Sequence, residues 1–510
     1  MARVYSNRLS EYAHENGGRV LLLFLLFLLA IYQLVSSGFT TFAIICISPL
    51  IILFVYAAFK WRMLTFWLLI TVNYFLQMKD ISESLPVPMS LPNEMLELVL
   101  IAIAIIDARQ DAHFNRALNL MLLAITIWGG LCFLEVFNDT CSLGINVGAW
   151  FVGARLIALQ LVWILLVFSI YISSPQILMT YLKLWALFSL FSAFWTYKQI
   201  YWGMTDTEKI WMQTRGRTTH ILNAGTLIRY FSTFSDAASY GCHAAAAATA
   251  FIIFGITNRI KKAKTFFLII AIAVIWGMFQ SGTRTAIFCL GAGLVVYIFL
   301  SKSVKIAVPF SIVCGFFAFL LVFTTIGQGN QQIRRMRSAF DKNDASANVR
   351  DINKEAMKKY LRDAPWGIGI GITGNVPANN KYSKLSMMPP DSEYVNIWKL
   401  TGTIGVSVFA FCNILIFIGG CIIVLFRLQN KTLIGIGAGF CCAFVSINLG
   451  GYANQVLFQY PNGLTFYGGM AIVYILPYLE PEWEEYEKKC IAKIEEKKRL
   501  KLEKKLAARV

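Results

Sequence analysis

The sequence predicts an all-α protein that crosses a membrane many times. Of its 510 residues, 57% are hydrophobic and only 15% are charged, and the mean hydropathy is +0.60. A soluble chain of this length needs far more polar surface to cover itself. Apolar runs of about 18–22 residues recur along the chain, and as helices they match the thickness of a bilayer. Because lipid offers the backbone no hydrogen-bond partner, each run must be helical.

About fourteen segments have the length and hydropathy of a membrane span. One of them, Val395–Phe426, is overlong, and we expect it to enter the membrane obliquely. The predicted spans are Val20–Val35, Phe39–Phe59, Met63–Leu76, Met95–Ile106, Ala117–Val136, Phe151–Ile172, Leu184–Thr196, Ala237–Ile256, Thr265–Gln280, Ala286–Leu300, Ile306–Ile326, Val395–Phe426, Thr432–Leu449 and Leu464–Leu479.

Two polar stretches separate these spans. The larger contains a predicted helix, Asn348–Leu361, that stops before Pro365. A charged tail follows the last span; it mixes Glu and Lys at helical spacing, as a solvated cytoplasmic helix does. The predicted parts are an N-terminal transmembrane bundle (1–327) with an outer loop (197–236), a large outer loop (328–392), C-terminal transmembrane helices (393–480) and the tail (481–510).

The basic residues of the short loops predict the orientation. They fall in every second loop, as with Lys60, Arg259, Lys302 and Arg427, and such residues are retained on the cytoplasmic side. Both termini are therefore expected in the cytoplasm and both long polar stretches outside. The same bias accounts for the net charge of +18 without a nucleic-acid partner.

Metal and cofactor chemistry is not indicated by the sequence. Most of the 11 cysteines lie inside predicted spans, where they behave as small apolar residues. The four histidines form no cluster with Asp or Glu at metal-ligand spacing. We therefore expect neither a metal ion nor a cofactor.

A set of arginines falls at the outer ends of the spans, where the positive-inside bias should deplete them. A guanidinium group offers a planar fork of donors that holds phosphate in a two-pronged fashion. The set therefore predicts a bound diphosphate at the outer headgroup level. The alternatives are phospholipid headgroups, or pairing with acids such as Glu97, Glu135 and Asp236. The predicted ligands are Arg155, Arg215, Arg217, Arg229, Arg284 and Arg350.

Three residues are candidates for a general base, which must lie within hydrogen-bond reach of the proton it removes. Asp391 and Glu393 come just before an apolar segment, at the same depth as the arginines. Asp391 has an alternative role as the cap of the following helix, and Glu393 as the partner of an arginine. His220 lies near Arg217 in the first outer loop; its alternative is a solvated loop histidine.

A glycine run, Trp366-Gly-Ile-Gly-Ile-Gly, ends the large loop. It superficially matches a nucleotide-binding turn, but no βαβ pattern surrounds it. Glycine tolerates backbone conformations that other residues avoid. We expect the run to let the backbone return tightly against the membrane helices.

The order of five motifs resembles that of the O-antigen ligase and polymerase superfamily. The similarity runs from about Arg155 to Gly405, and it implies a GT-C-like protein of the bacterial inner membrane with a large periplasmic loop. It also implies an inverting, metal-independent glycosyl transfer in which arginines matching Arg155, Arg229 and Arg284 hold the diphosphate. The motifs are Arg229-Tyr-Phe-Ser-Thr-Phe-Ser-Asp, Ser281-Gly-Thr-Arg-Thr-Ala, Trp366-Gly-Ile-Gly-Ile-Gly, Pro390-Asp-Ser-Glu-Tyr and Thr401-Gly-Thr-Ile-Gly.

One departure from the family pattern favours a polymerase. The ligase branch has His-Asn before the final motif, whereas this chain has Pro390-Asp-Ser-Glu. The expected reaction joins undecaprenyl-diphosphate-linked repeats of O-antigen, capsule or exopolysaccharide, with a lipid-linked glycan as donor and another as acceptor. A chain-length regulator and a flippase are possible partners in the bilayer.

Two other functions stay open at this point. One is the transfer of glycan by an O-antigen ligase or a protein O-oligosaccharyltransferase. The other, of a different class, is a flippase for lipid-linked oligosaccharides. Transporters need charged or broken helices near the midplane, whereas Ala286–Leu300 and Ile306–Ile326 contain no charged residue.

Overall fold

The computed structural model describes residues 17–37, 39–84, 88–107, 113–222, 227–302, 345–373 and 376–507, with isolated positions between 308 and 337. The chain forms two compact units, and the boundary along the sequence falls between Phe66 and Trp67. The first contains α2 (Gly17–Ser37), α3 (Phe39–Lys60) and the beginning of α4. Every residue considered below for function lies in the second unit.

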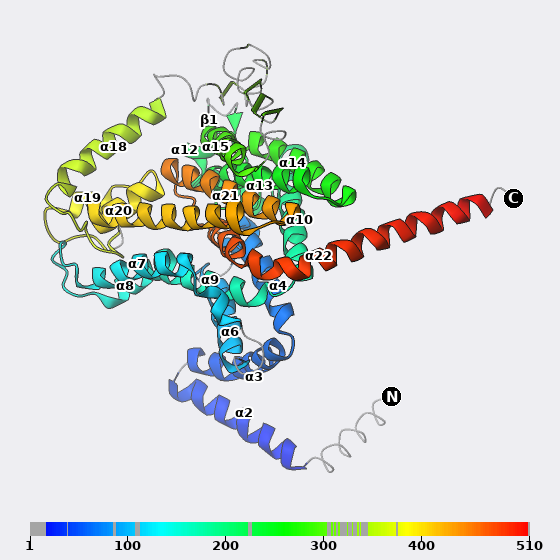
Figure 1. Ribbon diagram of the computed structural model, residues 1–510. Helices are drawn as coiled ribbons and strands as arrows, with labels where there is room; N and C mark the ends of the chain where they lie inside the picture. The colour runs from blue at the N-terminus through cyan, green and yellow to red at the C-terminus, as the bar shows by residue number, and fades with distance from the viewer. Residues whose placement is uncertain are drawn as a thin grey trace. The chain divides into compact units, whose positions relative to one another are not determined.

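The second unit is a set of helices with one small hairpin (Figure 1). Strands β1 (Ile221–Leu222) and β2 (Leu227–Ile228) are antiparallel, with Ile221 opposite Ile228. The helices are α4 (Arg62–Phe75), α5 (Lys79–Ser82), α6 (Leu91–Ile106), η2 (Phe114–Ala117), α7 (Leu120–Leu134), η3 (Glu135–Phe137), α8 (Val147–Ala154), the π-helix η4 (Arg155–Leu159), α9 (Gln160–Tyr171), α10 (Pro175–Tyr201), α11 (Asp206–Thr214), α12 (Arg217–His220), α13 (Ala237–Thr257), α14 (Lys261–Gln280), α15 (Arg284–Leu300), α18 (Ala345–Leu361), α19 (Ser383–Met387), α20 (Glu393–Ile422), the π-helix η7 (Ile423–Arg427), α21 (Lys431–Ala453) and α22 (Asn462–Ala507).

The protein is an all-α, multi-pass membrane protein. Among the described residues, seven helices are long and apolar enough to cross a membrane, and one pair of shorter helices qualifies only when taken together. Most of the predicted span Ile306–Ile326 lies outside the described residues, and every other predicted span overlaps an observed helix. The seven are Leu120–Phe137, Val147–Tyr171, Pro175–Tyr201, Ala237–Thr257, Lys261–Gln280, Glu393–Arg427 and Lys431–Ala453.

The predicted span Leu184–Thr196 was too short, since the observed helix α10 runs over Pro175–Tyr201. The segment was trimmed in the prediction because Lys183 and Lys198 interrupt its hydropathy. Lysine side chains reach out of an apolar environment along their own stems, so a helix continues through such positions. Lys183 is accordingly exposed.

Helix α13 forms the centre of the second unit and packs against α14, α15 and α21 (Figure 1). It contains a run of five alanines, Ala244–Ala248, all buried. Small side chains let helix backbones approach closely, which is how helices associate in lipid. With 21 residues, α13 is about 30 Å long and separates two ends of the bundle.

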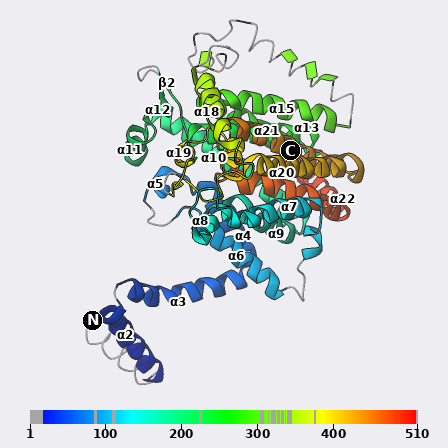
Figure 2. The ribbon, with the colours of Figure 1, turned by 90° about the vertical axis from the view of Figure 1, so that its left-hand side faces the viewer.

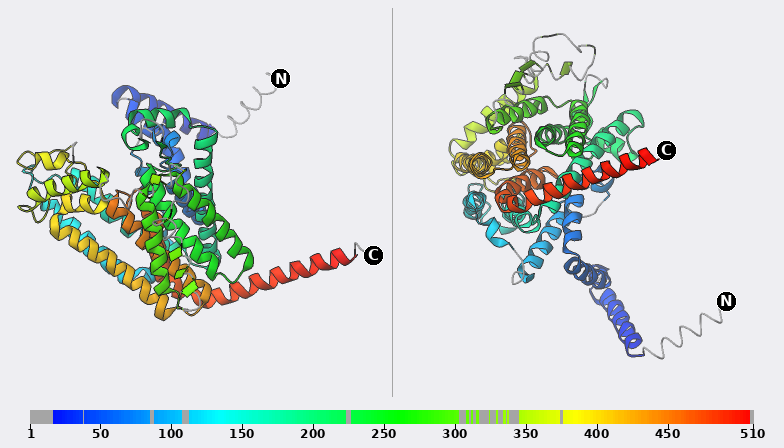
Figure 3. Two further views of the ribbon diagram at one scale, coloured as in Figure 1. Left: turned by 90° about the horizontal axis from the view of Figure 1, so that it is seen from above. Right: turned by 45° about the vertical axis from the view of Figure 1, so that its right-hand side comes forward.

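Within the second unit, three loops that were predicted to share a side lie near the charged tail or near one another. At the end of α13 that contains Thr257, Lys302 Nζ donates to the carbonyl of Leu428 at 3.1 Å, and Arg259 pairs with Glu487 at 3.4 Å. We call this the tail end, because α22 continues from it as one long helix (Figure 3). The opposite end, at Ala237, is the arginine end.

The part of the large predicted loop that the structure describes from residue 345 onward is folded at the arginine end. The predicted helix Asn348–Leu361 is confirmed as α18, which ends four residues before Pro365. Together with α19 it lies beside the start of α20 (Figure 2). A local apolar core holds this part together, and Cys141 of the α7–α8 connection joins it. The buried members are Cys141, Met357, Leu361, Ala364, Ile368, Ile372, Ala378, Tyr382, Leu385 and Leu400.

The glycine run attaches this folded loop to a break in α20. Gly402 has a φ of +67° and interrupts the helix, and Gly367 has a φ of +75°. The backbone N–H of Ile368 donates to the carbonyl of Lys399 at 3.1 Å, and that of Gly369 to the carbonyl of Leu400 at 2.8 Å. The predicted tight return of the backbone is thus confirmed, and the break at Gly402 lies inside the overlong predicted span.

Candidate functional site

The turn between α14 and α15 is the focus of the arginine end. Arg229 binds this turn through two of its guanidinium nitrogens and α12 through the third. Its Nε donates to the carbonyl of Ser281 at 3.3 Å, Nη2 to the hydroxyl of Thr283 at 3.0 Å, and Nη1 to the carbonyl of Thr219 at 2.9 Å. Five N–H donors in one plane suit this role, so the side chain orders the turn and brings a permanent charge to it.

A second arginine reaches the same turn, and a third begins the helix that follows it. Arg335 Nε donates to the carbonyl of Gly282 at 2.8 Å. Arg284 is the first residue of α15 and is half-buried. Two of the predicted diphosphate ligands, Arg229 and Arg284, thus belong to this turn and the helix start that follows it. Arg335 was missed because nothing in its surrounding sequence distinguishes it from other loop arginines.

The N-terminus of α15 is itself electropositive. The hydroxyl of Thr283, the residue before α15, donates to the carbonyl of Ala237 at 2.7 Å and accepts from Arg229. It does not cap the first turn of α15. Helix N-termini carry a partial positive charge and unpaired N–H groups that favour anions. Charge from the arginines and from the helix is therefore concentrated at one turn.

His220 lies behind this turn as part of the structure. Its side chain is buried, with 3% exposed, so the alternative of a solvated loop histidine is wrong. The N–H of Ala237 donates to Nε2 at 3.0 Å, and the other ring nitrogen lies 2.7 Å from the hydroxyl of Thr219. Because Nε2 accepts a hydrogen bond, the ring is neutral and carries its proton on Nδ1. This arrangement favours a structural role for His220 at the start of α13.

The acidity of His220 makes that role testable. Burial and the nearby charge of Arg229 lower the pKa of His220 to about 4, below the value near 6.5 of an unfolded chain. The unfolded chain then binds more protons between these values, so stability falls as the pH drops from about 6.5 to 4. We expect the melting temperature of the purified protein to fall across this range.

The variant His220→Gln serves as the comparison, since its amide oxygen can accept from Ala237 without titrating. It should lose most of this pH dependence. An equal fall in melting temperature for both proteins would show that other groups cause it.

A buried lysine supports the segment between Arg229 and α13. Lys79, on α5, donates from Nζ to the carbonyl of Ser235 at 2.6 Å, and Nζ lies 3.9 Å from the ring centre of Trp211. Burial lowers the pKa of Lys79 to about 8, against the opposing effect of Asp236. Asp236 caps α13 by accepting from the N–H of Ala238 at 2.8 Å, which gives its carboxylate a partner other than an arginine. Sequence analysis missed Lys79.

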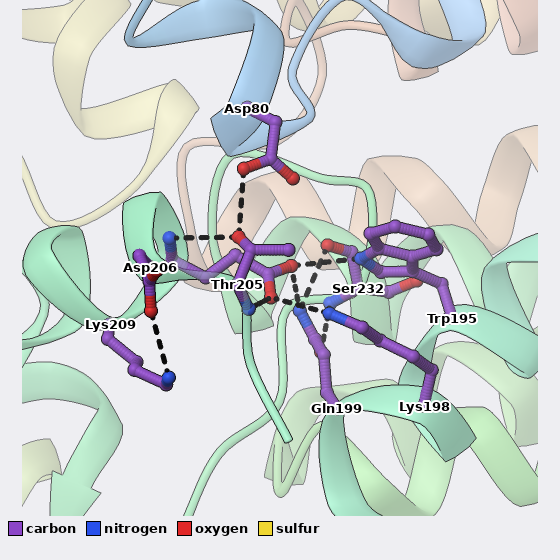
Figure 4. A network of polar contacts seen from close by, with 9 residues as sticks. Asp80, Trp195, Lys198, Gln199, Thr205, Asp206, Lys209 and Ser232 are labelled. Atoms are coloured by element: carbon purple, nitrogen blue, oxygen red, sulfur yellow. Dashed lines mark hydrogen bonds and ion pairs between the residues drawn. The ribbon is translucent and has the colours of Figure 1, made fainter. Parts of the chain in front are cut away.

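The polar loop 197–236 is anchored by a buried carboxylate (Figure 4). Glu208 accepts from the indole N–H of Trp195 at 2.9 Å and the amide of Gln199 at 2.7 Å. Its other oxygen accepts from the N–H of Thr205 at 2.8 Å, which completes a capping box at the start of α11. The hydroxyl of Thr205 donates to Asp80 at 2.8 Å. These bonds fix the loop that carries the predicted residues Arg215 and Arg217.

The connection between α21 and α22 joins the parts of this end. Asn454 Nδ2 reaches the hydroxyl of Thr285, next to Arg284, at 3.4 Å. Its carbonyl accepts from the N–H of Glu393 at 3.3 Å. Gln459 accepts from the hydroxyl of Ser235 at 2.6 Å. The segment 454–461 had no predicted role, because only its folded contacts bring it to the turn.

The two predicted acids before α20 have different surroundings. Asp391 accepts from the amide of Asn353 at 3.2 Å, and the cap of α20 is Ser392, which accepts from the N–H of Val395 at 3.1 Å. The capping alternative for Asp391 is therefore wrong. Glu393 is buried, and its carboxylate faces the backbone N–H groups of Leu457 and Phe458 rather than an arginine.

Three of the remaining predicted arginines have other surroundings. Arg155 begins η4 and pairs with Glu94 at 3.0 Å. Arg215 pairs with Glu83 at 3.1 Å on the surface, and Arg217 is exposed. Arg350 belongs to α18, but its side chain lies outside the described residues.

A polar network also crosses the interior of the bundle. His243, near the start of α13, is buried and lies 2.8 Å from the amide oxygen of Asn462 through Nδ1. Its other nitrogen faces the hydroxyl of Tyr74 at 3.4 Å. Buried polar groups in a membrane bundle pair with one another in this way. The network ties the start of α22 to α13, and sequence analysis gave His243 no role.

These observations define a multi-pass membrane protein with a cationic site at one end of its helices. Residues 269–410, from α14 into α20, match the family model described as O-antigen ligase (Wzy_C). The match confirms the resemblance to the O-antigen ligase and polymerase superfamily, whose members are glycosyltransferase-like enzymes. It includes Arg284, the glycine run and Glu393, while Arg155 and Arg229 precede it. No curated protein matches the sequence significantly.

Proposed function

We propose that the protein polymerises undecaprenyl-diphosphate-linked oligosaccharide repeats of O-antigen, capsule or exopolysaccharide. The observation that carries the proposal is the convergence of Arg229, Arg284 and Arg335 on the turn that begins α15. Guanidinium groups and a helix N-terminus are the two features that proteins use most readily to hold phosphate. The diphosphate of the lipid-linked donor would bind there.

The reaction follows from the charge at this turn. As the bond between the anomeric carbon and the diphosphate breaks, negative charge grows on the leaving group. Cations that are already in place stabilise that charge without further reorganisation. The arginines thereby supply the charge that a metal ion supplies elsewhere, and attack from the opposite face of the sugar would invert the anomeric carbon.

The membrane arrangement completes the proposal. In this arrangement the protein crosses the bacterial inner membrane about fourteen times, and both termini are in the cytoplasm. The arginine end and the folded loop then lie at the periplasmic face. The contacts that sort the loops into two ends support this arrangement. The donor and acceptor glycans both reach the site from the bilayer. A chain-length regulator and a flippase would accompany the enzyme.

The predicted bases fit the proposal unequally. Glu393 and Asp391 lie at the arginine end, but both carboxylates face donors of their own fold, and His220 accepts the N–H of Ala237. Arg155, Arg215, Arg217 and Arg350 are kept as secondary contributors to the positive field. The departure Pro390-Asp-Ser-Glu supports a polymerase over a ligase.

Deleting the gene tests the proposal at the level of the cell. A strain without the polymerase should still attach single repeats, so electrophoresis of its surface glycan should show one repeat and no ladder. Complementation with the wild-type gene should restore the ladder. Loss of all surface glycan would overturn the polymerase and favour a ligase or a flippase, and loss of glycan from proteins alone would favour an O-oligosaccharyltransferase.

A further inference from the structure

A second cluster at the arginine end combines two carboxylates with an arginine and a tyrosine. Glu94 and Glu97 are one turn apart on α6, and both are buried, with 6% and 0% exposed. Residues three apart on a helix are neighbours on one face. Arg155 pairs with the outer of the two, since its Nη1 lies 3.0 Å from Glu94 Oε2. We call Glu94, Glu97, Arg155 and Tyr460 the acidic pocket.

Tyr460 reaches the pocket from the 454–461 segment. Its side chain is buried, with 6% exposed. Burial and the charges of Glu97 and Glu94 raise the pKa of Tyr460, while the nearby side chain of Gln160 and the charge of Arg155 act in the opposite direction. The hydroxyl therefore lies within electrostatic reach of all three charged groups. Tyr460 also adjoins Gln459, which binds Ser235, so the pocket and the arginine turn border the same segment.

The pocket holds an unusual share of unpartnered polar atoms. In the described part of the chain, nine buried side-chain nitrogen or oxygen atoms make no hydrogen bond to protein, and four of the nine belong to this pocket. Leaving such an atom unpaired destabilises the fold, and more so when the group is charged. A group of them therefore points to a polar occupant. The four are Glu94 Oε1, Glu97 Oε2, Arg155 Nε and Tyr460 Oη.

The chemistry of these atoms defines the occupant. Two are carboxylate oxygens that need a donor, Arg155 Nε needs an acceptor, and Tyr460 Oη can do either. Sugar hydroxyls both donate and accept, so they suit all four, whereas an anion would be repelled by the carboxylates. Arg155 and Glu94 are the more exposed of the charged members, with side chains 17% and 8% exposed, whereas Glu97 is fully buried.

We propose that the acidic pocket binds the attacking hydroxyl of the acceptor sugar and that Glu97 takes its proton. This inference rests on the proposed glycosyl transfer. Glu94 is neutralised by Arg155, whereas Glu97 has only the neutral amide of Asn93 as a donor, at 3.0 Å from Oε1. The free Oε2 of Glu97 is thus the available proton acceptor. Glu94, Arg155 and Tyr460 orient the hydroxyl.

The proposed step transfers one proton and exchanges one bond at the anomeric carbon. The hydroxyl proton moves to Glu97 Oε2 while the hydroxyl oxygen forms the new bond to the anomeric carbon of the donor. The bond from that carbon to the diphosphate oxygen breaks, and its electron pair leaves with the lipid diphosphate, where Arg229 and Arg284 meet the charge. The proton then passes from Glu97 to solvent past Glu94 and Arg155.

Replacing Glu97 with Gln tests the base. The substrate is the lipid-linked repeat extracted from the deletion strain, and the purified full-length protein is assayed in lipid nanodiscs across pH. Glu97→Gln keeps the shape and the contact with Asn93 but cannot take a proton. We expect polymer formation to fall by about 10²–10⁴-fold, with a flat pH profile in place of the wild-type decline at low pH. Glu355→Gln, an exposed carboxylate on α18, should match the wild type.

Two further measurements distinguish loss of the base from a general loss of structure. Tyr460→Phe removes one hydroxyl and should raise the KM for the acceptor with little change in kcat. Binding of farnesyl diphosphate, used as the diphosphate probe, should be unchanged in Glu97→Gln. Normal activity and an unchanged pH profile for Glu97→Gln would overturn the proposal and leave the pocket as a site for ordered water only. Loss of farnesyl diphosphate binding in this variant would overturn it too.

Failure of the proposed polymerase function can be told apart from failure of the acceptor site. If the wild type forms no polymer from this extract and binds no farnesyl diphosphate, the polymerase proposal is overturned whatever the variants do, and the acceptor site falls with it. If the wild type is active and Glu97→Gln equals it, only the acceptor site is overturned.

Discussion

Arg284→Lys is expected to abolish polymer formation while the amount of protein in the membrane stays normal. Lysine keeps the charge but loses the planar fork that grips phosphate in two places. The position is the first residue of α15, where the helix adds its own partial positive charge. Loss of one well-placed donor to a developing charge typically costs about 10²–10³-fold in rate. Electrophoresis of surface glycan, with an immunoblot for the protein, measures both quantities.

A matched substitution separates this effect from a general loss of basic charge. Arg362, just after α18, is exposed at the same end of the molecule, and Arg362→Lys should leave the glycan ladder unchanged. A wild-type ladder from Arg284→Lys would show that this residue does not grip the diphosphate. In that case the convergence of arginines at the turn would be structural.

Sequence reasoning found the types of residue at the site better than their grouping. The arginines stood out because they fall on the predicted outer side, where basic residues should be rare. Their partners could not be read from the chain, since Arg229 reaches Ser281 and Thr283 from more than 50 positions away. Arg155 looked equivalent in sequence, yet the fold pairs it with Glu94. Grouping depends on long-range packing, which hydropathy does not encode.

Local sequence patterns also led to wrong roles for Asp391 and His220. Asp391 and Ser392 are both good helix caps, and the backbone gives the cap to Ser392. His220 looked solvated in a polar loop, but Trp211 and Phe231 pack around its ring. Burial of a loop residue depends on which apolar side chains fold over it, and Phe231 is separated from His220 by the hairpin.

One signal for the acidic pocket was present in the sequence. Glu94 and Glu97 stand three apart at the start of an apolar run, and acidic residues at membrane depth are functional candidates by default. Glu97 was instead considered as a partner for an arginine. The role of Tyr460 had no comparable signal, because a tyrosine in an outer loop is common at the membrane interface.

The glycine run illustrates what the sequence conveyed well. Three glycines spaced two apart predicted a backbone that other residues cannot adopt, and Gly367, Gly369 and Gly371 all have positive φ. The part of α20 that these glycines contact was not predicted, because Gly402 lies inside what looked like a continuous span. The break at Gly402 is where the folded loop and α20 meet, so the position offers a direct test of that junction.

Gly402→Ala is expected to unfold this junction and eliminate polymer. A Cβ at this position would overlap the carbonyl oxygen of Pro365, and the φ of +67° is unfavourable for alanine in any case. Backbone strain of this kind costs about 1–3 kcal/mol, and overpacking costs about 1–3 kcal/mol more. The protein should melt at a lower temperature in detergent, and the Ile368 and Gly369 backbone amides, which bond to α20, should lose their protection from hydrogen exchange.

Two other glycines separate the causes. Gly144 has a φ of +69° but open space around its Cβ position, and Gly291, in α15, has open space and helical φ. Gly144→Ala should show the backbone strain alone, and Gly291→Ala should be neutral or slightly stabilising, because alanine favours helix by about 1 kcal/mol over glycine. If Gly402→Ala destabilises no more than Gly144→Ala, the close contact with Pro365 does not hold the loop to α20. If all three variants behave alike, the break in α20 is not needed for the fold.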